Sequence, residues 1–397
     1  MKNAETHERD LIIFSNGPGE VSTWVQPVVE AVQKRSELSS MYRILLIVHP
    51  CPFGSGTEGS VARGFEGIEE FIGPGEYLKI LFTGLGRRKF RFSREGVIFS
   101  LGGDLMHPVL FRRRIKGRHT LYVYTKNQGW AKYYEKIFVR SDYVKNKMLK
   151  QGVSHQKLKV SGDLVYSSLK FLRPGLDVRE ELDIKDGEKM VVFLPGSRAF
   201  EVWYMLPMFL KVISDIADRI SGVKPFLLKS PYISYDFIEK ALANGGNIKV
   251  AENIPGELKR QGNNFLPYIE FSGGKRVSVL EKGLKYWGEG IDFAVTVPGT
   301  NTIQLAYREI PSLVVAPLNK PELYPVEGPL GLLKWIPLIG NMILKKAVFK
   351  YLTKFPYASL PNMYENEEIF PELFKVIQTD SPADLIIQEA FGDVVRI

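Results

Sequence analysis

Three short loops of this chain combine glycine with polar side chains that can bind an anion. They lie at residues 15–23, 194–202 and 298–304, and each is predicted to join the end of a strand to the start of a helix. Glycine lets the backbone approach a ligand closely, and the first turn of a helix offers unpaired N–H groups and a positive dipole end. Each loop taken alone is a weak signal, because any α/β protein contains such turns.

The second and third loops together favour a diphosphate ligand. Arg198 in the second loop adds a guanidinium to the two helix starts, and this combination suits a diphosphate group. The chain has no Gly-x-x-x-x-Gly-Lys-Ser/Thr motif, which argues against a P-loop NTPase. No Gly-x-Gly-x-x-Gly motif follows a predicted strand, which argues against a dinucleotide-dependent oxidoreductase.

Asp104 follows a predicted strand in the sequence Leu-Gly-Gly-Asp-Leu, where a carboxylate has two possible roles. It can act as a general base that takes a proton from an attacking hydroxyl group, or it can cap the next helix. Position alone favours the cap, and Glu20 in the first loop has the same two interpretations. His107, His119 and His155 lack the spacing of metal ligands, so we predict no metal site.

The elements that would position these loops form two series of strands with helical stretches between them. The first series is predicted at residues 11–15, 42–48, 97–101, 121–124, 136–139 and 158–162, and the second at 190–194, 225–228, 248–250, 293–297 and 313–316. Apolar strands that alternate with helices indicate parallel sheets covered on both faces. We therefore predict an α/β protein with two Rossmann-like doubly wound domains facing across a cleft. The boundary would fall between residues 163 and 187, and residues 244–290 would be the least regular part of the second domain.

Length and cysteine content fit an intracellular protein of two domains. A chain of 397 residues exceeds a usual single core. The single Cys51 excludes an intrachain disulfide and fits a reducing compartment. The first ten residues lack the apolar stretch of a secretory signal, so we expect a cytoplasmic location.

The net charge of +9 is concentrated in one stretch of the chain. Residues 87–150, which we call the basic belt, hold seventeen Lys and Arg against four Asp and Glu, a local excess of +13. A basic face favours anionic lipid, phosphorylated substrates or nucleic acid, and a solvated face without a partner is an equally good interpretation. Nucleic acid is the least favoured partner, because the aromatic residues fall mostly within predicted strands.

Residues 329–344 are almost entirely apolar and are followed by several lysines. Pro337 interrupts the stretch, which is too short to span a bilayer, so no transmembrane segment is predicted. Trp335 and the scattered lysines suit a helix that lies in a membrane interface. A core helix with snorkelling lysines is the equal alternative.

The polar segment at residues 357–373 carries the most specific motif of the chain. It reads Ser-Leu-Pro-Asn at 359–362 and Pro-Glu-Leu at 371–373. With the Leu-Pro-Gly-Ser-Arg sequence at 194–198, it resembles the lipid-A-disaccharide synthases, a membrane-associated family of GT-B glycosyltransferases. The resemblance extends over almost the whole chain, and the closing motif is far more specific than the glycine loops.

This resemblance implies transfer of an acylated N-acetylglucosamine-type sugar from UDP to a phosphorylated, acylated sugar, with inversion at the anomeric carbon and without a metal or other cofactor. Asp104 resembles the family's catalytic aspartate, and this resemblance favours its role as a general base over its role as a helix cap. Glu20 is the second catalytic candidate. Gly19 and Ser22 lie in the acceptor-side loop. The implied donor site comprises Ser197, Arg198, Glu201, Gly299, Thr300, Thr302, Gln304 and Asn362.

Four positions depart from the family pattern. Thr23 and Trp24 stand where the family has a glycine and an aspartate, so the identity of the acceptor is open. Gln304 replaces a glutamate that would bind the ribose hydroxyls, which removes the charge from that hydrogen bond. Asp163 replaces a histidine at the junction between the domains.

We therefore predict an acceptor and membrane-side domain at residues 1–167, a UDP-sugar-binding domain at 168–350, and a segment at 351–397 that returns to the first domain and faces its basic belt. The predicted protein is a membrane-associated inverting glycosyltransferase, peripheral on the inner face of the cytoplasmic membrane, with a UDP-sugar donor and a lipid-linked acceptor. Two alternatives stay open. One is a UDP-N-acetylglucosamine 2-epimerase, which would need further acids and histidines in the cleft. The other is a non-catalytic protein that binds nucleotide sugars or lipids.

Overall fold

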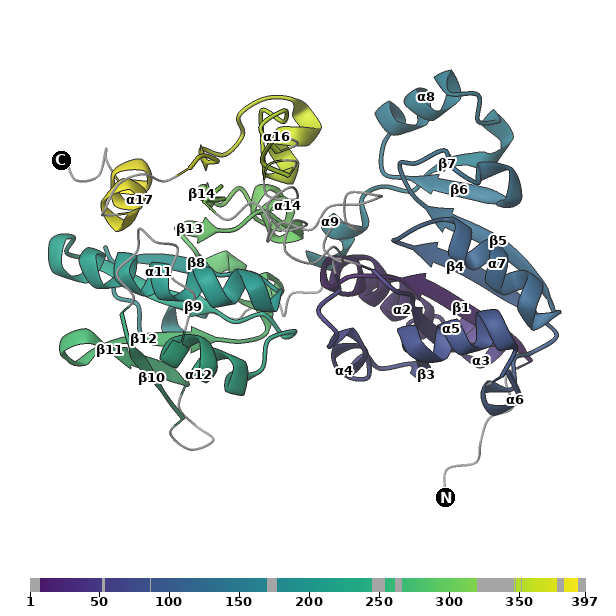
Figure 1. The fold of residues 1–397 in the computed structure, drawn as a ribbon, viewed down its shortest axis with the longest axis horizontal. Coiled ribbons are helices and arrows are strands. Elements are labelled where there is room, and N and C mark those ends of the chain that lie inside the picture. Colours follow the sequence, from purple (N-terminus) through teal and green to yellow (C-terminus); the bar gives the residue numbers. More distant parts are fainter. Residues whose placement is uncertain are drawn as a thin grey trace. The chain divides into compact units, whose positions relative to one another are not determined.

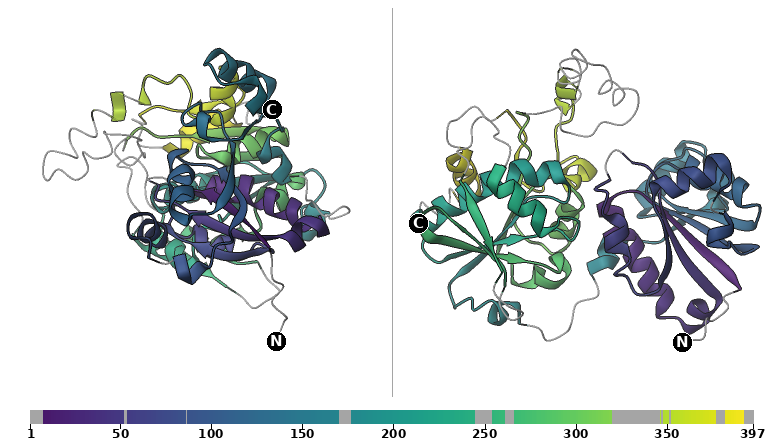
Figure 2. Two further views of the ribbon diagram at one scale, coloured as in Figure 1. Left: turned by 90° about the vertical axis from the view of Figure 1, so that its right-hand side faces the viewer. Right: turned by 60° about the horizontal axis from the view of Figure 1, so that its bottom comes forward.

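The computed structural model describes residues 8–51, 54–85, 87–169, 177–244, 254–260, 266–319, 346, 348–350, 352–376 and 382–391. The chain divides into two compact units, residues 1–170 and 171–397. Figure 1 labels their helices and strands, and Figure 2 gives two further views. The apolar stretch at 329–344 and the strand predicted at 248–250 lie outside the described residues.

The first unit is built on a parallel sheet of the order β3-β2-β1-β4-β5-β6-β7. Its strands are β1 Arg9–Ser15, β2 Tyr42–Val48, β3 Ile68–Ile72, β4 Glu95–Leu101, β5 Arg118–Tyr124, β6 Lys136–Val139 and β7 Leu158–Val160. Its helices are α1 Pro18–Glu20, a π-helical turn Val21–Val25, α2 Gln26–Gln33, α3 Ser36–Met41, α4 Glu58–Ala62, α5 Pro74–Thr83, α6 Arg87–Phe90, α7 Met106–Ile115, α8 Asp142–Lys150 and α9 Leu164–Leu169. Two short 3₁₀ turns, Ala131–Tyr133 and His155–Lys157, precede β6 and β7.

Helices cover both faces of this sheet because its central strands are apolar on both sides. Residues of α5, α7 and α8 share one core with Ile12 and Phe14 of β1. The π-helical turn, α2 and α9 pack together on the other side (Figure 1). Burial on both faces is the usual condition of a parallel sheet.

The second unit is built on a mixed sheet of the order β10-β11-β12-β9-β8-β13-β14-β15, parallel from β12 to β15. Its strands are β8 Lys189–Leu194, β9 Val223–Leu228, β10 Gly256–Lys259, β11 Tyr268–Phe271, β12 Lys275–Leu280, β13 Phe293–Thr296, β14 Ser312–Val315 and β15 Glu372–Leu373. Its helices are α10 Val178–Glu181, α11 Ala199–Arg219, α12 Tyr235–Asn244, α13 Gly283–Trp287, α14 Thr300–Tyr307, α16 Leu360–Glu365 and α17 Pro382–Phe391, with 3₁₀ turns at Ser272–Gly274 and Gly288–Gly290.

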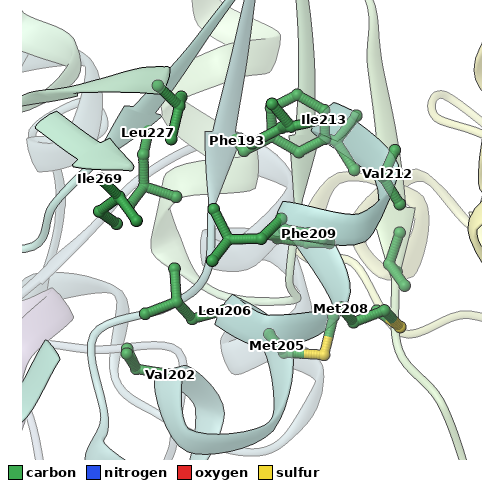
Figure 3. Close-up of a cluster of buried hydrophobic side chains, with 14 of the residues drawn as sticks. Phe193, Val202, Met205, Leu206, Met208, Phe209, Val212, Ile213, Leu227 and Ile269 are labelled. Carbon is green, nitrogen blue, oxygen red and sulfur yellow. The ribbon is translucent and has the colours of Figure 1, made fainter. Parts of the chain in front are cut away.

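Helix α11 supplies more of the core on one face of the second sheet than the other helices there, α12 and α17. Figure 3 shows its side chains turned toward the strands, with Phe209 beside Phe193 of β8. The two rings meet at 5.5 Å between centroids and 60° between planes, a favourable edge-to-face geometry. Residues of α10, α13 and α14 form a second core on the opposite face.

The predicted fold class is confirmed for each unit by itself: the chain holds two Rossmann-like α/β units in tandem, each with a parallel-dominant sheet. The strands predicted at 42–48 and 136–139 match β2 and β6 residue for residue. Residues 244–290 are more regular than predicted, because they contain β10, β11 and β12 in antiparallel pairs. No helix of the described part of the chain is long and apolar enough to cross a membrane.

The closing segment lies on the second unit, which corrects the prediction that it returns to the first. β14 pairs with β15 in parallel, with Val315 opposite Leu373. Ile386 and Ile387 of α17 are buried in the same core as α11, and Asp384 pairs with Arg219 at 2.5 Å. There β15 pairs with the edge of β14, and α17 buries its apolar face in the core. The acids of the segment therefore belong to the second unit.

One buried ion pair joins β1 and β2, two neighbouring inner strands of the first sheet, near their amino ends. Asp10 of β1 is fully buried and lies directly opposite Arg43 of β2, whose guanidinium is 3.0 Å from its carboxylate. The same carboxylate accepts hydrogen bonds from the backbone N–H and the hydroxyl of Ser93, at 2.7 and 3.1 Å. It therefore holds the segment before β4 against the sheet.

Replacing Asp10 by alanine removes the side-chain acceptor of the Ser93 N–H and the ion-pair partner of Arg43, whose guanidinium keeps its hydrogen bonds to the carbonyls of Phe90 and Arg91. We expect Asp10→Ala to lower the free energy of unfolding by about 3 kcal/mol, measured by urea denaturation. Glu95→Ala is the matched control, because Glu95 pairs with Arg118 at 2.7 Å but both side chains are exposed. The control should lose about 1 kcal/mol or less, and equal losses would contradict the special role of Asp10.

Candidate functional site

In the second unit the strand order reverses at β8, which has β9 on one side and β13 on the other. Leu194, the last residue of β8, is paired with Thr296, the last residue of β13. The loops that carry Arg198 and Gly299 therefore leave the same edge of the sheet side by side. Such a reversal is where open α/β sheets bind their ligands. The structure thus brings together two loops that the sequence analysis had connected only through their motifs.

The loop after β8 is shaped by the carboxylate of Glu201. Its Oε2 accepts hydrogen bonds from the backbone N–H groups of Ser197 and Arg198, at 2.9 and 3.1 Å, and its Oε1 accepts one from the Arg198 guanidinium at 2.7 Å. Gly196 has φ +111°, and a Cβ atom there would lie 2.3 Å from Glu201 Oε2. Glu201 therefore orients Arg198, while the two N–H groups predicted to face a ligand are already hydrogen-bonded to it.

The loop after β13 is closed in a similar way by Thr302. This residue is fully buried, and its hydroxyl donates to the carbonyl of Gly299 at 2.7 Å. Thr300 and Gln304 are half-buried and one turn apart on α14, so they share a helix face. Thr302 consequently shapes the loop, and Thr300 and Gln304 are the candidates to contact a ligand.

Asn362 folds the closing motif onto itself. Its amide nitrogen donates to the carbonyl of Phe370 and to Glu372 Oε1, both at 2.7 Å. Its amide oxygen accepts from the N–H groups of Ile369 and Phe370, at 2.8 and 2.9 Å. An asparagine amide has two donors and two acceptor sites, and all four are used. The fully buried Asn362 therefore has a folding role, and its contact with a ligand stays a prediction.

Glu372, in the Pro-Glu-Leu half of the motif, binds the same segment from the other side. Its carboxylate accepts from the backbone N–H groups of Ala358 and Ser359, at 2.6 and 2.9 Å, as well as from Asn362. The spacing of Ser-Leu-Pro-Asn and Pro-Glu-Leu thus has a structural reason. The two halves bind each other next to β15 and α16.

In the first unit the strand order reverses at β1, between β2 and β4. Asp104 follows β4 at this edge and is exposed, and its Oδ1 accepts a hydrogen bond of 2.8 Å from the N–H of Met106 at the start of α7. Asp104 thus contacts the first N–H group of α7, while the capping position itself is Leu105, which makes no side-chain hydrogen bond to the helix.

Glycines bring the loop of Asp104 against the loop that follows β1. Gly102 and Gly103 have φ +113° and +79°. A Cβ atom on Gly102 would lie 2.8 Å from the side chain of Glu20, and one on Gly103 would lie 2.0 Å from His49 Nε2. The two predicted catalytic carboxylates, Glu20 and Asp104, thus come from adjoining loops.

Two histidines and a tyrosine beside Asp104 were missed by the sequence analysis. The rings of His49 and His107 stack with centroids 4.2 Å apart, and Tyr77 Oη lies 2.7 Å from His107 Nδ1. Burial lowers the pKa of His49 to about 4, with a further contribution from His107, and burial also lowers the pKa of His107. Both imidazoles are therefore neutral at neutral pH. The position of His49 directly after β2 was the available signal.

Thr23 and Trp24, which depart from the family pattern, both pack against neighbouring residues. Thr23 is buried and its hydroxyl donates to the carbonyl of Gly19 at 2.7 Å. Trp24 meets Tyr124 edge-on at 5.2 Å between ring centroids. Ser22 lies on the same π-helical turn, half-buried, and such turns are frequent at functional sites. Among the described residues, no three His, Cys, Asp or Glu side chains are grouped as a metal site.

Comparison with solved structures returns proteins of two α/β domains at low similarity. The UDP-GlcNAc 2-epimerase from Methanocaldococcus jannaschii in complex with UDP-GlcNAc and UDP has a TM-score of 0.45 at 13% identity, over 77% of this chain and 83% of that one. The E. coli heptosyltransferase WaaC with ADP-2-deoxy-2-fluoro heptose has a TM-score of 0.39 at 15% identity, over 81% and 91%. Likeness at this level does not indicate what the present chain binds.

One curated protein matches in sequence. The lipid-A-disaccharide synthase of Gloeothece citriformis (strain PCC 7424) is 26% identical over 214 residues, which cover 54% of this chain and 42% of that protein. The match therefore spans less than half of the relative's length. No protein-family profile matches the chain.

Because the pKa of His49 is lowered in the folded protein, stability should fall in mild acid. Between pH 6.5 and about 4 the unfolded chain binds a proton at this position that the folded chain does not. The free energy of unfolding should therefore decrease as the pH is lowered through that window, by up to about 3 kcal/mol from His49. Urea denaturation at several pH values measures this.

The variant His49→Gln should lose this part of the pH dependence. His155→Gln is the matched control, because His155 is exposed in a 3₁₀ turn of the same unit. It should keep the wild-type dependence. A full dependence in His49→Gln would show that another group is responsible.

The folding role of Asn362 makes a different prediction from a ligand contact. Asn362→Ala removes the side-chain oxygen that accepts from the N–H groups of Ile369 and Phe370, so we expect a loss of about 3 kcal/mol in the free energy of unfolding. Glu368→Ala, an exposed change in the same segment, should be near neutral. Wild-type stability together with lost UDP binding in Asn362→Ala would restore the ligand contact.

Proposed function

We propose that this protein is a glycosyltransferase that moves a sugar from a UDP-sugar to a lipid-linked acceptor, in the manner of a lipid-A-disaccharide synthase. The observation that carries the proposal is the meeting of the Arg198 and Gly299 loops at the strand reversal of the second unit. The partial match to a lipid-A-disaccharide synthase supports the same class. Because that match spans 42% of the relative, its substrates are part of the proposal.

The second unit is proposed to bind the UDP-sugar. Arg198, oriented by Glu201, supplies the positive charge that the leaving diphosphate needs as the bond to the sugar breaks. Gly299 and Thr300 at the start of α14 would contact the nucleotide, with Gln304 one turn further reaching the ribose. Ser197 lines the same edge, while Glu201 and Thr302 hold the loops in place.

The first unit is proposed to bind and activate the acceptor. Asp104 takes the proton of the acceptor hydroxyl, whose oxygen forms a bond to the anomeric carbon. The bond from that carbon to the diphosphate oxygen breaks on the opposite face, and UDP leaves with the electron pair. Glu20 is the alternative base, and Gly19 and Ser22 belong to the acceptor side.

Peripheral membrane binding is part of the proposal and has a candidate surface. Phe82 and Leu85, at the end of α5, are 72% and 68% exposed, which is unusual for large apolar side chains. Arg114 donates to the carbonyls of Leu81 and Phe82, at 2.6 and 2.9 Å, so one arginine of the last turn of α7 lies next to them. Exposed apolar side chains beside an arginine suit an anionic membrane surface.

A UDP-N-acetylglucosamine 2-epimerase is the second candidate, and one observation favours it. That alternative requires further acids and histidines near the site. His49, His107 and Glu20 all lie at the same sheet edge as Asp104. The two activities differ in their need for an acceptor.

The test is turnover of UDP-N-acetylglucosamine-type donors with and without a lipid-linked sugar acceptor. We expect UDP release that depends on the acceptor, and a loss of about a hundredfold or more in kcat for Asp104→Asn. Asp142→Asn, an exposed change in the first turn of α8, is the control and should retain activity. An epimerised UDP-sugar formed without acceptor would support the epimerase. Donor binding without any turnover would leave only the non-catalytic alternative.

A further inference from the structure

A basic cavity lies at the other edge of the first sheet, away from Asp104. It has a volume of about 460 Å³ and is lined by residues around the amino ends of β5, β6 and β7. Asp104 follows the carboxyl end of β4, which pairs with β5 along its whole length. A strand of seven residues is roughly 20 Å long, so the cavity is separate from the proposed catalytic edge.

The lining of the cavity is strongly positive. Arg112, Arg118, Lys132 and Lys157 contribute four cations, and Glu135 is the one carboxylate among the lining residues. All five come from the basic belt or lie just beyond it. The excess of charge recognised in the sequence thus gathers partly in a concave site, and a concave surface lined by one sign of charge focuses its field on a ligand.

Most of this positive charge is not neutralised by neighbouring carboxylates. Neither Arg112 nor Lys132 forms an ion pair within the part of the chain that the structure describes. The ammonium of Lys157 donates to the carbonyls of Lys132 and Tyr134, at 3.0 and 2.7 Å, which are neutral groups. Only Arg118 is paired, at 2.7 Å from Glu95, and it remains largely exposed.

His119 adds an unsatisfied polar group to the lining. It is 1% exposed, and neither of its ring nitrogens has a hydrogen-bond partner among the described residues. Gly117 leaves room for the ring, because a Cβ atom there would lie 2.5 Å from His119 Nδ1. Buried polar groups without partners are rare in proteins, and one in a cationic cavity points to a polar ligand.

We propose that this cavity binds a phosphate group, either free, on a soluble phosphorylated compound, or on the headgroup of an anionic lipid. The Arg112 guanidinium and the Lys132 ammonium would bind its oxygens, with His119 as a further donor behind them. A cavity of this size holds one phosphorylated headgroup rather than a nucleic-acid duplex. The site does not depend on the proposed transferase activity.

The test measures binding of inorganic phosphate and of glycerol 3-phosphate by calorimetry, and sedimentation with phosphatidylcholine vesicles with and without phosphatidic acid. The double variant Arg112→Gln, Lys132→Gln removes two cations of the cavity. We expect it to weaken phosphate binding by about tenfold or more, since each cation contributes a charge-assisted hydrogen bond. Thermal unfolding would verify that the double variant is folded.

The matched control is Lys147→Gln, Lys150→Gln, which removes the same charge from the exposed end of α8, within the basic belt but outside the cavity. It should keep wild-type phosphate binding. An equal loss in the control would assign the binding to overall charge and overturn the site, as would absence of binding to all three probes in the wild type.

Further measurements distinguish a soluble phosphate from a lipid headgroup, and the cavity from the proposed transferase site. Binding to both soluble probes supports a free phosphate, and binding only to vesicles with phosphatidic acid supports a lipid headgroup. Nuclear magnetic resonance of the His119 imidazole should show a shift on addition of the probe that binds, and an unchanged ring would contradict the site. If UDP turnover is found, it should be unchanged in the double variant with a soluble acceptor; if none is found, the phosphate measurements still decide the cavity.

Discussion

The parallel pairing of the central strands is the constraint on which both halves of this protein depend. In a parallel sheet every strand ends at the same edge, so loops that are distant in the sequence meet wherever the order reverses. The reversals fall at β1 in the first unit and at β8 in the second. Gly102 and Gly103 then allow an approach between loops that a side chain would prevent, and Gly196 allows the same approach within the loop that follows β8.

Carboxylates that bind backbone N–H groups give these loops their shape. Glu201 does so after β8 and Glu372 does so in the closing motif, each through three hydrogen bonds to its own segment. A motif residue can therefore be needed for the shape of its own segment, as the four hydrogen bonds of Asn362 illustrate.

The first unit separates two kinds of chemistry along the strand axis. The carboxyl ends hold Asp104, Glu20 and the neutral imidazoles of His49 and His107, where a proton can be accepted. The amino ends hold the arginines that close α7 and the basic cavity. This division arises because α7 begins at one edge of the sheet and ends at the other, which carries the basic residues of its last turn away from Asp104.

The sequence by itself determined most of the parallel strands and the glycine loops that follow them. Runs of apolar residues bounded by glycine or charge predicted β2 and β6 without error, because burial on both faces leaves an unmistakable pattern. The antiparallel strands β10, β11 and β12 were not predicted, because half-exposed strands are polar on one side and lack a continuous apolar run. Tertiary structure alone decided which residues share a site. The stack of His49 on His107, the unpaired nitrogens of His119 and the return of β15 to β14 all join residues distant in the chain. No local pattern records such contacts, because they depend on the order and direction of the strands in the sheet.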